Sequence, residues 1–293
     1  MSYLTDRAGL EGKVAVVTGG AGGLGWPIAR DLARAGARVA VCDRDPAAVA
    51  DANRAFTEFA ATAFVRHADV RDPDAMEAFF AEIDGSFGRL DVLVDVPGGG
   101  FVAPLMATSR KGWQAIIDQN FTYVLDTTQR AVQRMQAQGT GGSIVYITSV
   151  EAHRAVPHRA VYGAMKAGVT NLAKTLALEL CDYKIRVNTV APDIFPTPAT
   201  GGMDPDFEAT AQGRLKRRVS IPAGRYGTGE DLSGCLLFLA SDLSAYVTGT
   251  TLHVDGGTLA SSGWFNWPEG GWANVPPDSV LQALEAASEI ASP

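Results

Sequence analysis

The chain has few basic residues, few cysteines and no long apolar runs. Lysine and arginine together number 25 against 32 acidic residues, and the net charge is -7 at pH 7. No basic surface of the kind that binds a phosphate backbone is therefore expected, which argues against a nucleic-acid partner. No uncharged apolar run reaches the roughly 18 to 20 residues of a membrane-spanning helix, and the first residues lack the apolar stretch of a signal peptide. The sequence predicts a cytoplasmic protein with no membrane partner.

Cysteine is scarce, with three in 293 residues: Cys42, Cys181 and Cys235. They are odd in number, widely spaced and outside any CxxC or Cys/His group, so we predict neither a disulfide framework nor a metal site. We interpret them as reduced packing residues. Hydrophobic residues make up 46% of the chain and charged residues 19%, which is typical of one large globular domain.

Short β-branched runs alternate with longer helical patterns from about residue 12 to residue 181. This alternation is typical of βαβ units. We predict an α/β fold of the Rossmann type: a doubly wound, seven-stranded, mostly parallel sheet with helices on both faces. The predicted strands are Val14–Thr18, Arg38–Cys42, Ala63–His67, Val92–Val96, Ser143–Thr148, Arg186–Val190 and Thr251–Val254, and the predicted helices are Leu24–Ala35, Ala47–Phe59, Asp74–Phe87, Phe121–Gln138, Val161–Leu180 and Glu230–Ala240.

Two segments interrupt this alternation. From about residue 193 to 225 the chain is rich in proline and glycine and then basic, which is typical of a mobile lid over a ligand. A tail with three of the five tryptophans follows, ending in a predicted helix from Asp278 to about Ile290. We predict a single Rossmann domain over residues 1–257. The tail, residues 258–293, is expected to pack on this domain or on a neighbouring subunit, because aromatic residues are common in subunit contacts.

A glycine-rich turn, TGGAGGLG, follows the first predicted strand and leads into a helical pattern. Glycines in such a turn let the backbone approach a pyrophosphate, whose charge is met by amide groups at the start of the helix. The turn would also fit a tight strand-to-helix connection without a ligand, but its place after the first strand of a βαβ unit favours a nucleotide site. The candidate residues are Gly19, Gly22, Gly23, Leu24 and Gly25.

The second predicted strand leads into Asp43. A carboxylate there accepts hydrogen bonds from the adenosine ribose and repels a 2′-phosphate, which favours NAD over NADP as the cofactor. Arg44, in contrast, favours NADP, because a guanidinium pairs with a 2′-phosphate. Asp69 and Val70, at the end of the third predicted strand, are candidates for contact with the adenine, and they also fit a plain polar strand end.

Three further residues form a pattern that is typical of enzymes that reduce carbonyl groups. Ser149 follows a predicted strand, while Tyr162 and Lys166 are four residues apart in a helical pattern and therefore share one helix face. A free phenol has a pKa of about 10, but a nearby ammonium and a positive nicotinamide ring favour its ionised form. Tyr162 is thus a candidate general acid and base, and Ser149 a candidate donor to the substrate oxygen. Alone, the Tyr-Lys pair would equally fit a helix with a half-buried tyrosine and an exposed lysine.

With the glycine turn, these residues resemble the short-chain dehydrogenase/reductase family over about residues 13–257. The resemblance implies that Ser149, Tyr162 and Lys166 form a catalytic triad and that Asn120, at a helix break, holds a water in a proton relay. It makes Lys166 a ligand of the nicotinamide ribose and assigns Thr197 to the carboxamide. The other positions that would border the cofactor are Val96, Gly98, Pro192 and Phe195.

The chain departs from this family at two positions. Asp95 replaces the first asparagine of Asn-Asn-Ala-Gly, which ties neighbouring strands, and we expect the change to be locally destabilising. Asp193 replaces the glycine of a Pro-Gly pair, a position that relies on glycine's backbone freedom, although aspartate tolerates such angles better than most residues. Neither change removes a catalytic group, so we expect altered specificity rather than loss of function.

Candidate substrate-facing residues lie after the fourth and fifth predicted strands and in the lid. Phe101 and Met203 favour a hydrophobic or ring-bearing alcohol or ketone, whereas Glu151 and His153 leave room for a polar group; His153 also fits an exposed loop residue. The sequence predicts an NAD(H)-dependent oxidoreductase that interconverts a secondary alcohol and a ketone. The alternatives are a catalytically silent dinucleotide-binding sensor or scaffold and an epimerase or dehydratase. The resemblance implies a homotetramer or homodimer.

Overall fold

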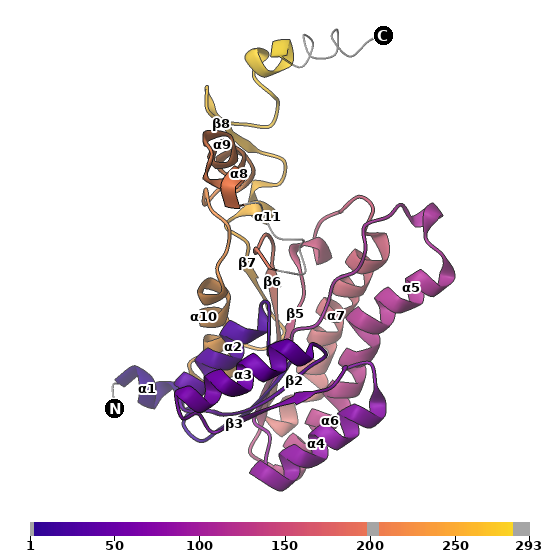
Figure 1. The fold of residues 1–293 in the computed structure, drawn as a ribbon, viewed down its shortest axis with the longest axis vertical. Coiled ribbons are helices and arrows are strands. Elements are labelled where there is room, and N and C mark those ends of the chain that lie inside the picture. Colours follow the sequence, from indigo (N-terminus) through magenta and orange to yellow (C-terminus); the bar gives the residue numbers. More distant parts are fainter. Residues whose placement is uncertain (1–2, 198–204, 284–293) are drawn as a thin grey trace.

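Seven parallel strands form one sheet in a computed structural model that describes residues 3–197 and 205–283. The strand order is β3-β2-β1-β4-β5-β6-β7 and every neighbouring pair is parallel (Figure 1). The chain direction across the sheet reverses between β1 and β4, and in such folds ligands bind at this reversal, beyond the carboxyl ends of the strands. The strands are β1 (Val14–Thr18), β2 (Arg38–Asp43), β3 (Ala63–His67), β4 (Val92–Asp95), β5 (Gly142–Ile147), β6 (Ile185–Pro192) and β7 (Thr251–Val254).

Helices cover both faces of the sheet, which confirms the predicted fold class (Figure 1). One face is covered by α2 (Gly25–Arg34), α3 (Pro46–Glu58) and α10 (Gly229–Ala240). The other is covered by α4 (Pro73–Phe87), α6 (Tyr123–Gln138) and α7 (Ala160–Glu179), with α5 (Arg110–Ile117) packed on α7.

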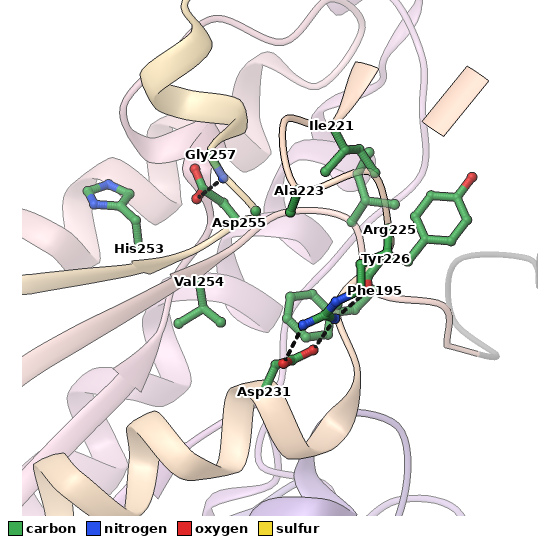
Figure 2. A pocket seen from close by; sticks show the side chains of 13 residues that line it. Phe195, Ile221, Ala223, Arg225, Tyr226, Asp231, His253, Val254, Asp255 and Gly257 are labelled. Atoms are coloured by element: carbon green, nitrogen blue, oxygen red, sulfur yellow. Dashed lines mark hydrogen bonds and ion pairs between the residues drawn. The ribbon is translucent and has the colours of Figure 1, made fainter. Parts of the chain in front are cut away.

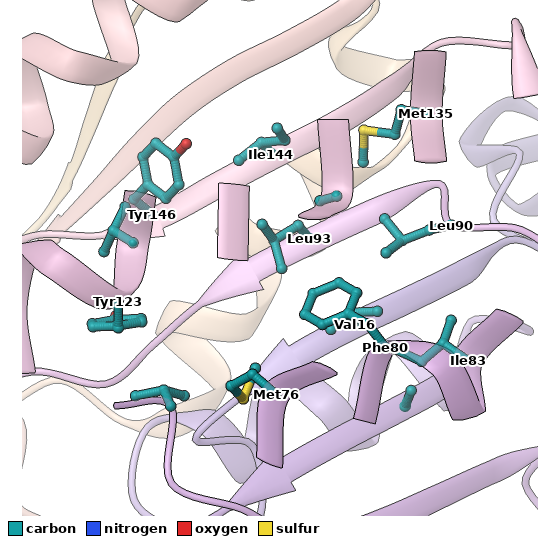
Figure 3. Packing of buried hydrophobic residues seen from close by; sticks show 14 of the residues in the cluster. Val16, Met76, Phe80, Ile83, Leu90, Leu93, Tyr123, Met135, Ile144 and Tyr146 are labelled. Carbon is teal, nitrogen blue, oxygen red and sulfur yellow. The ribbon is translucent and has the colours of Figure 1, made fainter. Parts of the chain in front are cut away.

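Each face has its own hydrophobic core, because side chains alternate along a strand. In β1, Val14 and Val16 belong to the core under α4, α6 and α7, while Ala15 and Val17 belong to the opposite core. Figure 3 shows the first core, in which Phe80 of α4 faces Val16. A strand buried on both faces must be apolar throughout, which explains why these strands are continuous apolar runs in the sequence.

The predicted strands and helices all occur, with bounds that differ by at most two residues. The helix predicted from Phe121 is the exception in its detail, since a π-helical turn, Asp118–Thr122, precedes α6. Two helices, α1 (Tyr3–Ala8) and α5, were not predicted from the sequence. Cys42 is buried as expected, but Cys181 is exposed, so its interpretation as a packing residue is wrong.

The lid and the tail lie together beyond the carboxyl ends of β6 and β7 (Figure 1). The lid, expected to be irregular, contains two helices, α8 (Pro205–Ala209) and α9 (Ala211–Ser220). The tail begins with α11 (Thr258–Ser261) and continues as an antiparallel hairpin of β8 (Phe265–Trp267) and β9 (Gly271–Ala273), with β8 in contact with α9. The tail therefore packs on the lid. A helix begins at Asp278, and its predicted end at Ile290 lies outside the described residues.

Asp95 keeps the tie expected of the family's asparagine. Its carboxylate is fully buried and accepts hydrogen bonds from Thr18 Oγ1 in β1 at 2.9 Å and from Thr127 Oγ1 in α6 at 2.6 Å. Burial raises the pKa of this carboxyl group to about 7. The expected local destabilisation therefore has its physical basis in a buried charge and not in missing hydrogen bonds.

The argument that Asp193 needs glycine's backbone freedom is wrong. Ala60, His158, Lys184 and Ser262 are the non-glycine residues with positive φ in the described part of the chain, and Asp193 is not among them. The backbone of Asp193 has no positive φ, so the change from glycine acts at this position through the added side chain.

None of the described helices is long and apolar enough to cross a membrane. Within residues 3–197 and 205–283, no group of three or more His, Cys, Asp or Glu residues is placed to hold a metal ion.

Candidate active site

The glycine turn between β1 and α2 has the geometry of a phosphate cradle. A Cβ atom on Gly25 would lie 2.0 Å from the carbonyl oxygen of Gly19, so a side chain there would push α2 away from the turn. Gly19 and Gly23 have φ values of 61° and 51°, which favour glycine. At Gly23 an added Cβ would meet no atom within 4 Å among the described residues. The turn is thus closed on its inner side and open on its outer side, which fits the approach of a pyrophosphate.

A cleft of about 150 Å³ lies next to this turn, at the carboxyl ends of the first four strands. It brings together six of the predicted cofactor residues. The same cleft includes four residues that the sequence argument missed, all of them shortly after a strand or on the π-helical turn. Its lining residues are Gly19, Asp43, Arg44, Ala68, Asp69, Val70, Arg71, Pro97, Gly98 and Gln119.

Two carboxylates in this cleft are held in different ways. Asp43 accepts hydrogen bonds from the backbone amides of Ala21, at 3.2 Å, and Asp45, at 3.1 Å, which fix it at the end of β2 beside the glycine turn. Asp69 pairs with Arg71, whose Nε lies 2.9 Å from Asp69 Oδ1. Hydrogen bonding from Arg71 keeps the pKa of Asp69 below its usual range. Asp69 is therefore ionised and already engaged by a guanidinium, a partner that the adenine assignment did not include.

Ser149, Tyr162 and Lys166 converge at the carboxyl end of β5. Ser149 is buried just beyond this strand, and its side chain is near enough to Tyr162, on α7, to lower the pKa of the phenol by hydrogen bonding. Lys166, one turn further along α7 and 3% exposed, donates from Nζ to the carbonyl oxygen of Ile147 at 2.8 Å. A Cβ atom on Gly98 would lie 2.5 Å from this Nζ, so glycine is needed for the close approach of the two segments.

Asn120 lies in the π-helical turn and is fully buried. Its Oδ1 accepts from the Gly99 amide at 2.9 Å, and its Nδ2 donates to the carbonyl oxygens of Gly99 at 2.7 Å and Ile116 at 2.8 Å. The π-helical turn changes the backbone pairing here, and the asparagine side chain takes up the Ile116 carbonyl. Asn120 thereby fixes the segment after β4 next to Lys166.

The pKa of Tyr162 is raised, chiefly by burial. The hydrogen bond with Ser149 and the charge of Arg159 lower it, whereas the charges of Glu151 and Asp193 raise it further. Burial also lowers the pKa of Lys166 to about 8, with the Asp95 charge acting in the opposite direction. From the sequence, Lys166 and the nicotinamide ring were the charges expected near the phenol, whereas the charges of Arg159, Glu151 and Asp193, which lie outside the strands and α-helices, were not predicted to act on it.

A cavity of about 470 Å³ lies between the segment after β5, the end of β6, α9 and the tail, and one of its lining residues, Asp193, acts on the Tyr162 phenol through its charge. Its volume suits a small molecule. It includes His153, one of the four predicted substrate residues, and Glu151 is hydrogen-bonded to its wall through Arg154. The lining residues are His153, Arg154, Asp193, Ile194, Ser220, Thr258, Leu259, Ser261, Ser262, Gly263 and Phe265.

The other predicted site residues lie elsewhere. Phe101 is half exposed and faces a separate small recess, and Met203 lies outside the described residues. Phe195 is buried against Gly227 and borders a different cavity of about 340 Å³, next to the Arg225–Asp231 ion pair (Figure 2). Of the remaining cofactor candidates, Val96 is half-buried just after β4, Pro192 is buried at the end of β6, and Thr197 is half-buried beside residues 198–204, which the structure does not describe.

A glycine cradle, an adjoining cleft and a Ser-Tyr-Lys cluster on one edge of a parallel sheet define a class of nicotinamide-dependent oxidoreductases. Sequence comparison assigns the same class, since a family model described as enoyl-(acyl carrier protein) reductase matches residues 19–258. The chain belongs to the short-chain dehydrogenase/reductase family.

The names of similar proteins indicate which type of reaction is common among the relatives. The chain is 38% identical over 256 residues to 3beta-hydroxysteroid dehydrogenase 1 of Eggerthella lenta, covering 87% of this chain and 97% of the relative. It is 36% identical over 276 residues to cyclohexanol dehydrogenase of Rhodococcus sp., covering 88% of this chain and all of the relative. A gluconate 5-dehydrogenase from Burkholderia cenocepacia, solved with NADP and tartrate, has a TM-score of 0.79 and 33% identity over 88% of this chain and 99% of its own. The protein is accordingly an oxidoreductase acting on CH–OH groups.

Proposed function

We propose that this protein interconverts a secondary alcohol and a ketone on a small, mainly apolar or ring-bearing molecule, with NAD(H) as its cofactor. The observation that carries the proposal is the convergence of Ser149, Tyr162 and Lys166 beside a glycine cradle on one edge of the sheet. A cavity large enough for a ring-sized molecule is lined by Asp193, whose charge acts on the Tyr162 phenol. The cyclohexanol and hydroxysteroid dehydrogenases among the relatives act, by their names, on ring-bearing alcohols.

The residues around the cradle and cleft fit a nicotinamide dinucleotide. Gly19, Gly22 and Gly23 would hold the pyrophosphate and Asp43 the adenosine ribose. Lys166 would hold the nicotinamide ribose. Thr197 is the proposed partner of the carboxamide, and Val96, Gly98, Pro192 and Phe195 belong to the segments that would border the ring.

Proton transfer is assigned to Tyr162. When bound, the cofactor supplies the site that accepts or donates hydride. Tyr162 takes the hydroxyl proton during alcohol oxidation and returns it to the carbonyl oxygen during reduction. Ser149 donates a hydrogen bond to the same oxygen and so orients it. Lys166, with a pKa lowered to about 8 by burial, provides a group that can change protonation near neutral pH beside the phenol.

The test of this proposal is the absorbance of reduced nicotinamide, followed with NAD and with NADP over a panel of cyclic, aromatic and aliphatic secondary alcohols. We expect turnover with NAD that falls by about 100-fold or more in Tyr162→Phe, since the phenol is the proton-transferring group. Equal turnover in this variant would exclude the role of Tyr162. Cofactor binding without turnover of any alcohol would favour a catalytically silent sensor or scaffold. Inversion of the configuration of the alcohol without net reduction of NAD would favour an epimerase.

The preference for NAD rests on Asp43. Its carboxylate is fixed by two backbone amides, so a 2′-phosphate at this place would meet a negative charge that cannot move away. Two guanidinium groups line the same cleft: Arg71 is paired with Asp69, whereas Arg44 lies next to Asp43 and remains the signal that favours a 2′-phosphate. The NADP-bound gluconate dehydrogenase shows that relatives of this fold take the phosphorylated cofactor, so the preference needs a direct test.

Removing this charge should move the preference toward NADP. In Asp43→Asn we expect the ratio of kcat/KM for NADP to that for NAD to rise by about tenfold or more, equivalent to roughly 1.4 kcal/mol. Asp51→Asn, which removes an exposed carboxylate of α3, is the matched control and should leave the ratio unchanged. An unchanged ratio in Asp43→Asn would refute the proposed role of Asp43.

We further propose a body of residues 1–257 with a distinct tail of residues 258–293, and a homodimer or homotetramer in the cytoplasm. Exposed leucines on the outer helices support self-association: Leu125 of α6 is 40% exposed and Leu178 of α7 is 77% exposed. Apolar side chains at such positions are common in subunit contacts.

A further inference from the structure

A charged cluster links the active site to the neighbouring cavity. Arg154 Nη2 lies 3.1 Å from both carboxylate oxygens of Asp193 and 3.3 Å from Glu151 Oε1. Asp193 also accepts a hydrogen bond from Thr258 Oγ1 in α11. The cluster therefore joins the segment after β5, the end of β6 and the start of the tail, and Asp193 is the residue that replaces the family's glycine.

The cluster carries one net negative charge, since two carboxylates face one guanidinium. His153 adds no positive charge at neutral pH, because burial, His253 and Lys174 keep its pKa below the usual range. The Asp193 and Glu151 side chains are only 8% and 16% exposed, so water screens this charge weakly.

One acceptor of the cluster is unsatisfied. Glu151 Oε2 is buried and has no hydrogen-bond partner among the described residues. A buried carboxylate oxygen is stabilised by a hydrogen-bond donor, and Glu151 is joined to the cavity wall through Arg154, so a molecule that reaches Oε2 has to carry such a donor. A hydroxyl group meets this need, whereas a second carboxylate would add repulsion.

The cluster also lies close to the reacting position. The charges of Glu151 and Asp193 both act on the Tyr162 phenol, while Arg154 and Asp193 line the cavity. A substrate whose reacting oxygen meets Tyr162 therefore has this charged wall beside it. The tail supplies apolar lining of the same cavity through Leu259 and Phe265.

We propose that Glu151 and Asp193, with Arg154 held between them, select a neutral alcohol that carries a second hydroxyl group and reject an alcohol that carries a carboxylate. This inference rests on the proposed function, and it names the class of substrate that the same site takes. Arg154 is a weaker carboxylate receptor than a free guanidinium, because its Nη2 is already engaged by two carboxylates that offset its charge.

Three compounds with one ring test the selection: cyclohexanol, cis-cyclohexane-1,4-diol and cis-4-hydroxycyclohexanecarboxylate. We expect kcat/KM with NAD to be highest for the diol and at least about tenfold lower for the carboxylate than for cyclohexanol, since a buried like charge is strongly unfavourable. Saturation-transfer NMR on the complex with NAD measures binding of each compound. A carboxylate that reacts or binds as well as cyclohexanol would overturn the proposal.

Two variants remove the charges with little change of shape, Asp193→Asn and Glu151→Gln. Each should raise the ratio of carboxylate to diol in kcat/KM by about tenfold, whereas loss of a merely structural contact would lower all three compounds together. Asp84→Asn is the matched control, because it removes a carboxylate paired with Arg134 on the outer helices and should leave the ratio unchanged.

The pH dependence gives a second readout. Ser149, Arg159, Lys166, Glu151 and Asp193 are the polar and charged groups identified around the Tyr162 phenol in the described chain. Removing a negative charge favours the phenolate, so the pH profile of kcat/KM should shift to lower pH in both variants. An unshifted profile together with an unchanged ratio would refute the role of the cluster.

Failure of this inference and failure of the proposed function give different results. Turnover that depends on Tyr162 but ignores the carboxylate refutes only the selection. Preferential binding of the diol without turnover of any compound supports the selection and refutes the proposed function. If the diol neither binds nor reacts while cyclohexanol is turned over, only the selection is wrong, and if no compound binds or reacts, both are wrong.

Discussion

Asp95 shows how a single buried residue couples the stability of the fold to pH. It occupies a buried position between Thr18 and Thr127, and burial raises the pKa of its carboxyl group from 3.8 to about 7. Because the folded-state pKa lies above the unfolded one, the stability contributed by this group is fully present below about pH 4 and is lost as the pH rises through about 7. At neutral pH, ionisation of the buried Asp95 carboxyl group therefore lowers the stability of the folded state.

An amide at the same position should remove this loss. Asp95→Asn keeps one oxygen that accepts from one threonine hydroxyl and places an NH2 that can donate to the other, and it has no charge to bury. We expect the stability of the variant relative to the original protein to increase between about pH 5 and about pH 7, by an amount on the order of a few kcal/mol. Urea denaturation at the two pH values measures it, and a difference that does not vary with pH would exclude the explanation.

At this scale the sequence predicted side chains whose position follows from local regularity. Tyr162 and Lys166 share a helix face because they are four residues apart, and the turn glycines follow the first strand directly. The pairs Arg154–Asp193 and Arg71–Asp69 were not predicted. Their side chains lie on loops, so sequence spacing does not fix which groups they meet.

Among the elements, the π-helical turn Asp118–Thr122 has the most direct effect on the site. It places Asn120 where three hydrogen bonds fix the segment after β4. The sequence predicted a helix there but not the π-helical turn, because one extra residue in a helical turn leaves no clear mark on hydrophobic periodicity.

The hairpin β8–β9 is the element whose removal tests the role of the tail. Truncation before Trp264 takes away Phe265, an apolar wall of the cavity, and leaves the sheet and the catalytic cluster in place. We expect KM for a ring-bearing substrate to rise by about tenfold, since burying an aromatic contact contributes on the order of 1–2 kcal/mol. Steady-state kinetics measure KM, and sedimentation reports the assembly state. Unchanged kinetics and unchanged assembly together would show that the tail has neither role.

Short elements were also the hardest to predict. Strands β8 and β9 have three residues each, and α8 has five, so hydrophobic periodicity has no length over which to act. The tryptophans nevertheless predicted that this segment packs on the domain or on a neighbouring subunit. In the structure, β8 contacts α9.

Across the whole molecule, parallel topology explains why distant segments meet at one edge. All seven strands end on the same side of the sheet, so the turn after β1, Ser149 after β5 and Asp193 after β6 lie along a single line of strand ends. Alternation of strands and helices in the sequence was enough to predict this arrangement. It did not predict the extension made by the lid and tail, which lies outside the repeating pattern.

The cavity wall supplied by the tail divides the chain into two separable parts. Every residue of the triad precedes residue 167, whereas Thr258, Leu259 and Phe265 are encoded at the far end of the chain. Change in the last segment can alter which molecules enter without altering how they react. Substitutions in the last segment are therefore suited to changing the substrate specificity while the catalytic residues stay the same.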